Sequence, residues 1–227
     1  MTLVRRPAGG GTACARPSRP DARQARTSTQ KLVMFDFDGV IADSWAVQKP
    51  VFVEAMRAHG LHDYASADAF NAIMDANWFD GLSAAGVPEH VITAMDETWG
   101  AQTPDLFPGM PEVIERLAEV HVVLVITSAG TEGVSRILKA HDVAGVTDVL
   151  GGDLEPSKAR KIRDAHRLYG ESLEPWYVCD TVGDVIEARE AGAGVIGTAW
   201  GWHGEERLLA SKPDWIARHP FDLLELL

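Results

Sequence analysis

Two aspartates, Asp36 and Asp38, follow a short apolar run at residues 31–35 and are followed at once by Gly39. Alternation along an extended chain sends both side chains roughly the same way, and a glycine at position 39 allows a sharp turn beyond them. Two acidic groups at the carboxyl end of a buried strand are costly unless something compensates, and a divalent cation does so. The pair therefore indicates a metal-assisted nucleophile beside a proton donor.

Three further strand ends bring polar residues to the same predicted edge. Thr127 and Ser128 follow the apolar run at 121–126, and the segment after residues 146–150 ends in Lys158. A fourth apolar run ends in Asp180, with Asp184 four residues on. If these strands are neighbours, two pairs of carboxylates, a hydroxyl and an ammonium group face one point.

Phosphoryl transfer needs that set of groups. One carboxylate can attack phosphorus and form an aspartyl-phosphate, while a second acid protonates the leaving oxygen and then activates water. A Mg²⁺ ion held by oxygen ligands screens the phosphate from the carboxylates. A threonine hydroxyl, backbone amides and a lysine bind the equatorial oxygens, where charge lies in the transition state.

Each residue alone has a simpler explanation. The first aspartate pair could be a structural cation site, and the stretch around Lys158 could be a solvated helix face. Lys161 competes for the phosphate-binding role, but Lys158 is preferred because it lies on the first turn of the predicted helix. Helix capping is the alternative at Thr127, Ser128, Asp180 and Asp184. The order of all these residues along alternating strands and helices favours a catalytic site.

The elements that must position these residues alternate along the chain. Apolar, β-branched runs predict buried parallel strands; they cover residues 31–35, 121–127, 146–150, 176–180 and 193–199. Amphipathic segments predict helices between them; they cover residues 111–119, 131–141, 157–169 and 182–191, with a closing helix at 219–227. This is an α/β pattern, an open doubly wound parallel sheet whose ligands bind at the carboxyl ends of its strands.

One interval, residues 44–107, contains helical patterns and no good strand. Helices are predicted at 44–59, with Ser44 as a candidate N-cap, and at 66–76 and 88–99. Because the insertion leaves and rejoins the predicted active edge, we interpret it as a helical cap over a catalytic core of residues 31–43 and 108–227. The alternative is a set of extra helices in the same core. Trp78, Phe79 and Trp99 should form the small core of the cap, and Trp45, Trp200 and Trp202 could line the cleft.

Composition narrows the function classes. The chain has 227 residues and a formal net charge of −12, which argues against nonspecific nucleic-acid binding. Residues 1–30 hold six arginines and one acid, a net +5 that leaves −17 for the rest. We expect this basic leader to be disordered, and whether it belongs to the mature protein stays open. No apolar run reaches membrane-spanning length. Two distant cysteines, Cys14 and Cys179, favour a reducing, cytoplasmic location.

Four motifs resemble those of the haloacid dehalogenase (HAD) superfamily, over about residues 31–202. They read VMFDFDGV, VVLVITS, EPSKARKI and CDTVGD, and only the first and last are specific on their own. The position of the insertion is similar to that of the helical-cap subgroup, which includes phosphoglycolate phosphatase-like enzymes and β-phosphoglucomutase. One departure is Cys179, where the family usually has glycine.

The resemblance implies a Rossmann-like core, a Mg²⁺ cofactor, Asp36 as nucleophile and Asp38 as general acid and base. Thr127, with Ser128 beside it, and Lys158 would contact phosphate. The metal site would draw on Asp36, the Asp38 main-chain carbonyl, Asp180 and Asp184. We therefore expect a Mg²⁺-dependent phosphatase that hydrolyses a small phosphomonoester. A phosphomutase of the same family and a noncatalytic HAD-like binding protein are the alternatives, and the sequence leaves the substrate and the choice of monomer or homodimer open.

Overall fold

A sheet of six parallel strands forms the centre of the computed structural model, which describes residues 30–227. The strand order is β3-β2-β1-β4-β5-β6, so the chain adds strands on one side of β1 and then on the other. The strands are β1 (Lys31–Phe35), β2 (Val122–Ile126), β3 (Asp148–Leu150), β4 (Glu174–Cys179), β5 (Gly194–Thr198) and β6 (Trp215–Ala217). This order confirms the predicted doubly wound α/β sheet. The predicted leader, residues 1–30, lies outside the described residues apart from Gln30.

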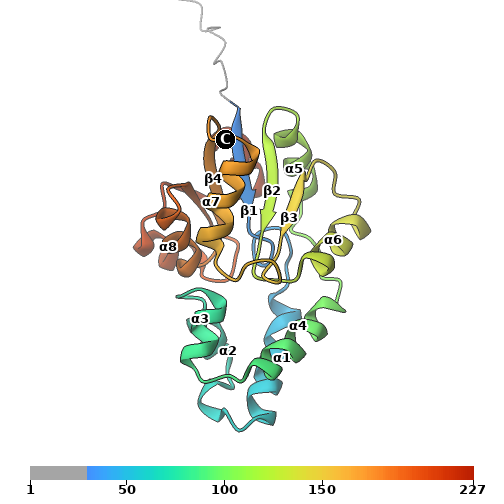
Figure 1. The fold of residues 1–227 in the computed structure, drawn as a ribbon, viewed down its shortest axis with the longest axis vertical. Coiled ribbons are helices and arrows are strands. Elements are labelled where there is room, and N and C mark those ends of the chain that lie inside the picture. The colour runs from blue at the N-terminus through green and yellow to red at the C-terminus, as the bar shows by residue number, and fades with distance from the viewer. Residues whose placement is uncertain (1–29) are drawn as a thin grey trace, which may run out of the picture.

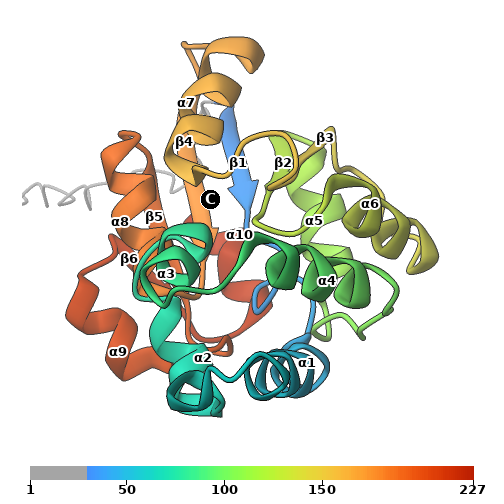
Figure 2. The same cartoon turned by 60° about the horizontal axis from the view of Figure 1, so that its bottom comes forward.

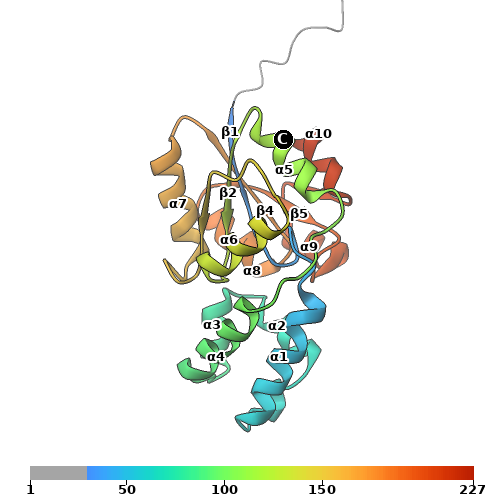
Figure 3. The same cartoon turned by 90° about the vertical axis from the view of Figure 1, so that its right-hand side faces the viewer.

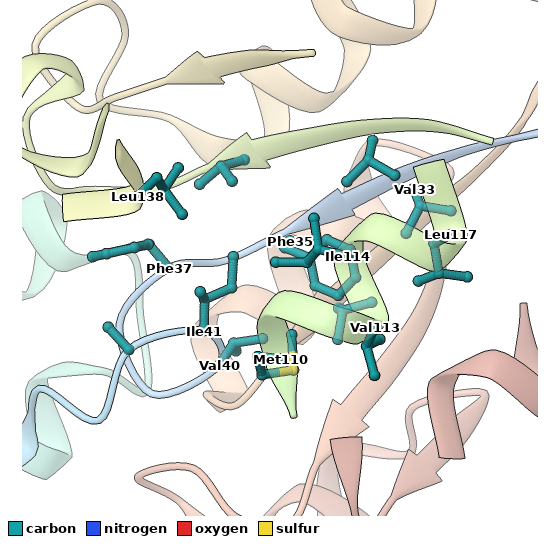
Figure 4. Close-up of a cluster of buried hydrophobic side chains, with 14 of the residues drawn as sticks. Val33, Phe35, Phe37, Val40, Ile41, Met110, Val113, Ile114, Leu117 and Leu138 are labelled. Atoms are coloured by element: carbon teal, nitrogen blue, oxygen red, sulfur yellow. The ribbon is translucent and has the colours of Figure 1, made fainter. Parts of the chain in front are cut away.

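Helices cover both faces of the sheet, with α7 on one side and α5 and α10 on the other (Figure 3). Val33 and Phe35 of β1 pack with α5 and α6 on one face (Figure 4), while Leu32 and Met34 pack with α7 and α8 on the opposite face. Burial on both faces explains the continuous apolar strands. The core helices are α5 (Met110–Ala118), α6 (Thr131–Ala140), α7 (Lys158–Tyr169), α8 (Val182–Glu190), α9 (Gly204–Ser211) and α10 (Leu223–Leu226).

The end of the chain differs most from the sequence prediction. Helix α9 and the three-residue edge strand β6 were not predicted, and the tail forms a short 3₁₀ helix at Pro220–Asp222 before the single turn of α10. Leu208 of α9 and Leu223 of α10 are both fully buried, so these elements close opposite faces of the sheet. No helix among the described residues has the length and apolarity needed to cross a membrane.

Four α-helices fill the interval between β1 and α5 and lie beyond the carboxyl ends of the strands (Figures 1 and 2). They have a separate core that includes Phe52, Phe70, Trp78 and Met95. The helices are α1 (Trp45–Ala58), α2 (Ala67–Ile73), α3 (Trp78–Ala84) and α4 (Glu89–Gly100), with a 3₁₀ turn at His62–Tyr64. The structure thus contains the predicted helical cap, whose boundaries at residues 44 and 107 stay a prediction.

The side chain of Ser44, predicted as an N-cap, makes no capping hydrogen bond to α1. Its backbone already lies in the right-handed helical region rather than in the extended conformation that an N-cap residue normally adopts. The prediction of a Ser44 cap is therefore wrong, although the helix does begin at the next residue.

The two chain segments that join the cap to the core run side by side. The Asp43 amide donates to the Asp105 carbonyl at 2.9 Å, and the Phe107 amide donates to the Ile41 carbonyl at 2.9 Å. On the far side, the cap touches the core again, where the Gly183 amide donates to the Met74 carbonyl at 3.0 Å. The cap therefore lies over the strand ends and contacts the core on both sides of them.

Candidate active site

Strands β1 and β4 are hydrogen-bonded neighbours at the point where the strand order reverses. Side chains that follow parallel strands meet at the same edge of the sheet, and the reversal leaves a crevice there. Asp36 follows β1 and Asp180 follows β4, while Asp184 lies on the first turn of α8. One carboxylate oxygen from each of these three buried residues lies within 4.8 Å of the others.

Lys158 neutralises part of this negative charge from the first position of α7. Its Nζ lies 3.0 Å from Asp36 Oδ2 and 2.8 Å from Asp184 Oδ1, and all three side chains are buried. Burial lowers the Lys158 pKa, but the charges of Asp184 and Asp36 outweigh it and hold that pKa above its ordinary value. The ammonium group is therefore charged and fixed between two carboxylates.

Asp184 is held by the start of its own helix. The Thr181 hydroxyl caps α8 by accepting from the Asp184 amide at 3.3 Å. Burial raises the Asp184 pKa to about 7, although the neighbouring Lys158 charge lowers it. Three acids and one lysine in a buried site leave an excess of negative charge.

Asp180 occupies a space left by two glycines. A Cβ on Gly39 would lie 2.0 Å from Asp180 Oδ2, and one on Gly201 would lie 2.2 Å from Asp180 Cβ. Asp180 Oδ2 accepts a 2.7 Å hydrogen bond from the Trp202 amide, whereas the buried Oδ1 has no partner among the described residues. Burial and the Asp36 charge raise the Asp180 pKa well above its ordinary value.

An unpartnered carboxylate oxygen among three converging acids is what a bound cation would satisfy. The donors are all oxygens of hard carboxylates, the set that suits Mg²⁺ rather than a metal that prefers nitrogen or sulfur. The residues present therefore fit the expected ion, with Asp36, Asp180 and Asp184 as the groups able to hold it. That the Asp38 main-chain carbonyl joins them stays a prediction.

Asp38 lies beside Asp36 at the wall of a cavity, on the loop that leads into the cap. Its Oδ1 accepts a 2.5 Å hydrogen bond from the Gln48 amide group, which reaches down from α1. Burial raises the Asp38 pKa to about 6, against the opposing effects of Gln48 and Lys158. A carboxyl group with a raised pKa can hold a proton at a pH where an ordinary aspartate cannot, as a general acid requires.

Thr127 and Ser128 follow β2 and line the same cavity. The Thr127 hydroxyl oxygen accepts from the Ala129 amide at 3.1 Å and does not cap α6, whose N-cap is Gly130. Lys161 lies one turn beyond Lys158 and donates instead to the Thr127 carbonyl oxygen. Lys158, and not Lys161, therefore contacts the acids of the site, while the phosphate-binding role of Lys158 stays a prediction.

The Cys179 side chain is fully buried and points into the core face that Ile162 and Val185 also line. Its free thiol is not within the acidic cluster. The side chain of the cysteine in place of the usual glycine thus packs away from the acidic cluster, and the Cys179 carbonyl oxygen accepts from the Thr198 hydroxyl at 3.4 Å.

The cavity of about 300 Å³ is bounded by the strand ends on one side and by the cap on the other. Trp202 lines it, as the sequence suggested, and so do Trp78, Phe79 and Trp99 from the cap. Trp45 instead stacks on Phe70 in the cap core, and Trp200 packs against the core of the sheet. The expectation that Trp45 and Trp200 line the cleft is therefore wrong, because each is held by apolar neighbours.

Sequence reasoning missed Gln48, Asp96 and the Trp202 amide. Gln48 lies one turn after the start of the first cap helix, and a helix placed against the Asp38 loop would have pointed to it. Asp96 lies on α4 next to the buried Met95, in a segment whose pattern predicted only a packed cap helix. The Trp202 amide is a backbone group on a loop, and no side-chain pattern could have revealed it.

A family model described as haloacid dehalogenase-like hydrolase matches residues 33–198 of the chain. The phosphoglycolate phosphatase of Vibrio parahaemolyticus is 26% identical, covering 87% of this chain and 96% of that protein. The phosphoglycolate phosphatase of Synechococcus elongatus is 25% identical, covering 85% and 95%. A haloacid dehalogenase-like hydrolase from Streptococcus pneumoniae has the same fold, with a TM-score of 0.72 at 22% identity over 87% of this chain and 98% of that one.

Proposed function

The chain belongs to the haloacid dehalogenase-like hydrolase family and is a phosphatase, and we propose that it uses Mg²⁺ to hydrolyse a small phosphomonoester through an aspartyl-phosphate. The observation that carries the proposal is the contact of Lys158 Nζ with Asp36 Oδ2 at 3.0 Å, beside the converging acids Asp180 and Asp184. A binding protein would have no need for a buried, partly uncompensated acidic cluster at the floor of a cavity.

In the first step, a carboxylate oxygen of Asp36 attacks phosphorus and the bond from phosphorus to the ester oxygen breaks. Asp38 donates its proton to that leaving oxygen, so the alcohol departs neutral. In the second step, Asp38 takes a proton from water, the water oxygen attacks phosphorus, and the Asp36 carboxylate is released with inorganic phosphate. Gln48 holds the Asp38 carboxyl group in place for both transfers.

Mg²⁺, when bound by Asp36, Asp180 and Asp184, would offset the charge between the dianionic phosphate and the carboxylates. Lys158 supplies a fixed positive charge in contact with both Asp36 and Asp184. The Thr127 hydroxyl and the main chain at Ser128, which line the same cavity, would bind phosphate oxygens by hydrogen bonds. The cap excludes bulk water and contacts the leaving group.

Phosphate release from an aryl phosphate tests the proposal. The wild-type chain should release phosphate with Mg²⁺ and lose that activity in EDTA, and Asp36→Asn should abolish turnover while the chain stays folded. Full activity of Asp36→Asn would end the nucleophile assignment. With a hexose 1-phosphate as substrate, free phosphate supports a phosphatase, whereas an isomerised sugar phosphate supports the phosphomutase alternative.

The cellular location and the oligomeric state stay predictions. The free thiol of Cys179 is compatible with the reducing, cytoplasmic location expected from the cysteine content. A cavity of about 300 Å³ suits a small-molecule substrate rather than a polymer.

A further inference from the structure

The cavity has two chemically different ends. The core end carries Asp36, Asp38, Thr127 and Lys158, which act on the phosphoryl group. The cap end is mainly apolar and aromatic; the cap residues that line it include Val47, Gln48, Met74, Trp78, Phe79, Asp96 and Trp99. Because the phosphoryl group must lie at the core end, the leaving group must lie against the cap end.

Asp96 is the charged residue that the cap contributes to this lining. It lies on α4 one turn before Trp99, and none of the described lysine, arginine or histidine side chains forms an ion pair with it. Burial raises the Asp96 pKa to about 6, because the buried carboxylate loses contact with water and no cation among the described residues offsets this cost. A positively charged group on a ligand would remove that cost.

Positive charge in the cavity lining is confined to the core end. Among the described residues that line the cavity, Lys158 is the one cation, and Asp36 and Asp184 engage it. A leaving group with a carboxylate, such as glycolate, would meet Asp96 without a lysine or arginine from the cap to receive it. The charge distribution therefore disfavours an anionic leaving group and favours a cationic one.

The aromatic rings that line the same cavity as Asp96 also favour a cation. Trp78 and Trp99 have ring centroids 5.5 Å apart, and both line the cavity together with Phe79 and Trp202. Aromatic faces attract ammonium groups, and tryptophan does so best. A cavity lined by both a carboxylate and tryptophan rings combines an ion-pair partner with an apolar wall for the methylene or methyl groups of an alkylammonium.

We infer that the substrate is the phosphomonoester of an amino alcohol, with its ammonium group held by Asp96 against Trp99 and its neighbouring rings. This inference rests on the phosphatase function proposed above. Hydrolysis consumes one water and yields inorganic phosphate and the free amino alcohol, with no other reactant. Asp96 is thus a specificity-determining residue, separate from the groups that act on phosphorus.

Steady-state kinetics of the full chain with Mg²⁺ test the inference. Phosphoethanolamine and phosphocholine are compared with glycerol 3-phosphate, which has a neutral leaving group, and with phosphoglycolate, which has an anionic one. Phosphoethanolamine and phosphocholine are called the ammonium esters below. We expect kcat/KM for at least one of them to exceed that for glycerol 3-phosphate by about tenfold, and phosphoglycolate to have the lowest kcat/KM. A preference for phosphoglycolate, or no preference for either ammonium ester, would overturn the inference.

A pair of charge-matched variants locates the preference. Asp96→Asn should lower the ratio of kcat/KM for the ammonium ester to kcat/KM for glycerol 3-phosphate by about tenfold. Glu97→Gln removes the same charge from the next, exposed position of α4 and should leave that ratio as in the wild type. If Asp96→Asn lowers kcat/KM for every ester equally, Asp96 acts through Asp38 instead and the inference fails.

The two proposals fail in different ways. If glycerol 3-phosphate and an aryl phosphate are hydrolysed in an Asp36-dependent reaction without a preference for ammonium esters, the phosphatase function stands and the substrate inference falls. If none of the esters is hydrolysed, both fall. Thermal unfolding of each variant, followed by circular dichroism, separates a changed site from a chain that has not folded.

Discussion

The ammonium nitrogen of Lys158 lies 3.0 Å from Oδ2 of Asp36 and holds that carboxylate at the floor of the cavity. The same nitrogen reaches both oxygens of Asp184 at 2.8 Å, so one lysine joins the residue that follows β1 to the first turn of α8. A buried charge that loses its partner is strongly destabilising, because it keeps the desolvation cost without the attraction. The stability of the folded chain should therefore depend on this lysine and on any cation that can replace its charge.

Lys158→Met should destabilise the chain in EDTA by roughly 3 kcal/mol, because two buried carboxylates then face each other unpaired. Mg²⁺ should recover part of that loss by binding the same acids. Urea unfolding with EDTA and with Mg²⁺ measures both effects. The double variant Asp36→Asn/Lys158→Met should lose less than the sum of the single variants; simple additivity would show that the two residues do not interact.

Gly39→Ala should impair the metal site. A Cβ at Gly39 would lie 2.0 Å from Asp180 Oδ2, so the carboxylate must move, and the backbone φ of +77° adds strain. The Mg²⁺ concentration that half-saturates phosphate release should rise by at least about tenfold, the usual effect of disturbing groups that orient a metal ligand.

Gly60→Ala is the matched control for Gly39→Ala, since Gly60 has a similar φ of +73° with no atom within 4 Å of the added Cβ. It should lose about 1 kcal/mol of stability from the left-handed backbone and keep the wild-type Mg²⁺ dependence. Equal effects of the two substitutions on Mg²⁺ dependence would contradict the placement of Gly39 against Asp180.

Lys161 should make stability depend on alkaline pH. Burial lowers its folded-state pKa from 10.5 to about 8. Between those values the unfolded state binds more protons than the folded state, so stability rises with pH. The free energy of unfolding of the wild type, relative to Lys161→Met, should rise by up to about 3 kcal/mol from pH 8 to pH 10.5.

Urea unfolding in EDTA across this pH range checks the prediction for Lys161. Lys139 lies at an exposed position of α6. The difference in the free energy of unfolding between the wild type and Lys139→Met should therefore not change over this pH range. A flat difference for Lys161→Met as well would mean that this ammonium group is solvated in the folded chain.

The sheet and the acidic cluster could be predicted from sequence because both depend on local patterns. Continuous apolar runs identify strands buried on both faces, and parallel strands carry their carboxyl-terminal residues to one edge, so Asp36, Thr127 and Asp180 could be placed together. Lys158 could be preferred over Lys161 because the first turn of a helix that follows a strand lies at that same edge.

What could not be predicted depends on contacts between distant segments. Strand β6 forms by pairing with β5, and its three residues are too few to show a periodic pattern. Trp200 and Trp202 lie two residues apart on one loop, yet one packs on the sheet core and the other lines the cavity. Asp96 gains its significance only when the cap places α4 over the strand ends, which no pattern within α4 reveals.

Phosphorylation of Asp36 during turnover can be detected by chemical trapping. Borohydride reduces an aspartyl-phosphate to homoserine, so the full chain is quenched during steady-state turnover of an aryl phosphate with Mg²⁺, reduced and mapped by peptide mass spectrometry. We predict homoserine at position 36, absent when substrate or Mg²⁺ is omitted. Homoserine at position 38 instead, or unmodified Asp36 during continued hydrolysis, would show that Asp36 is not the nucleophile.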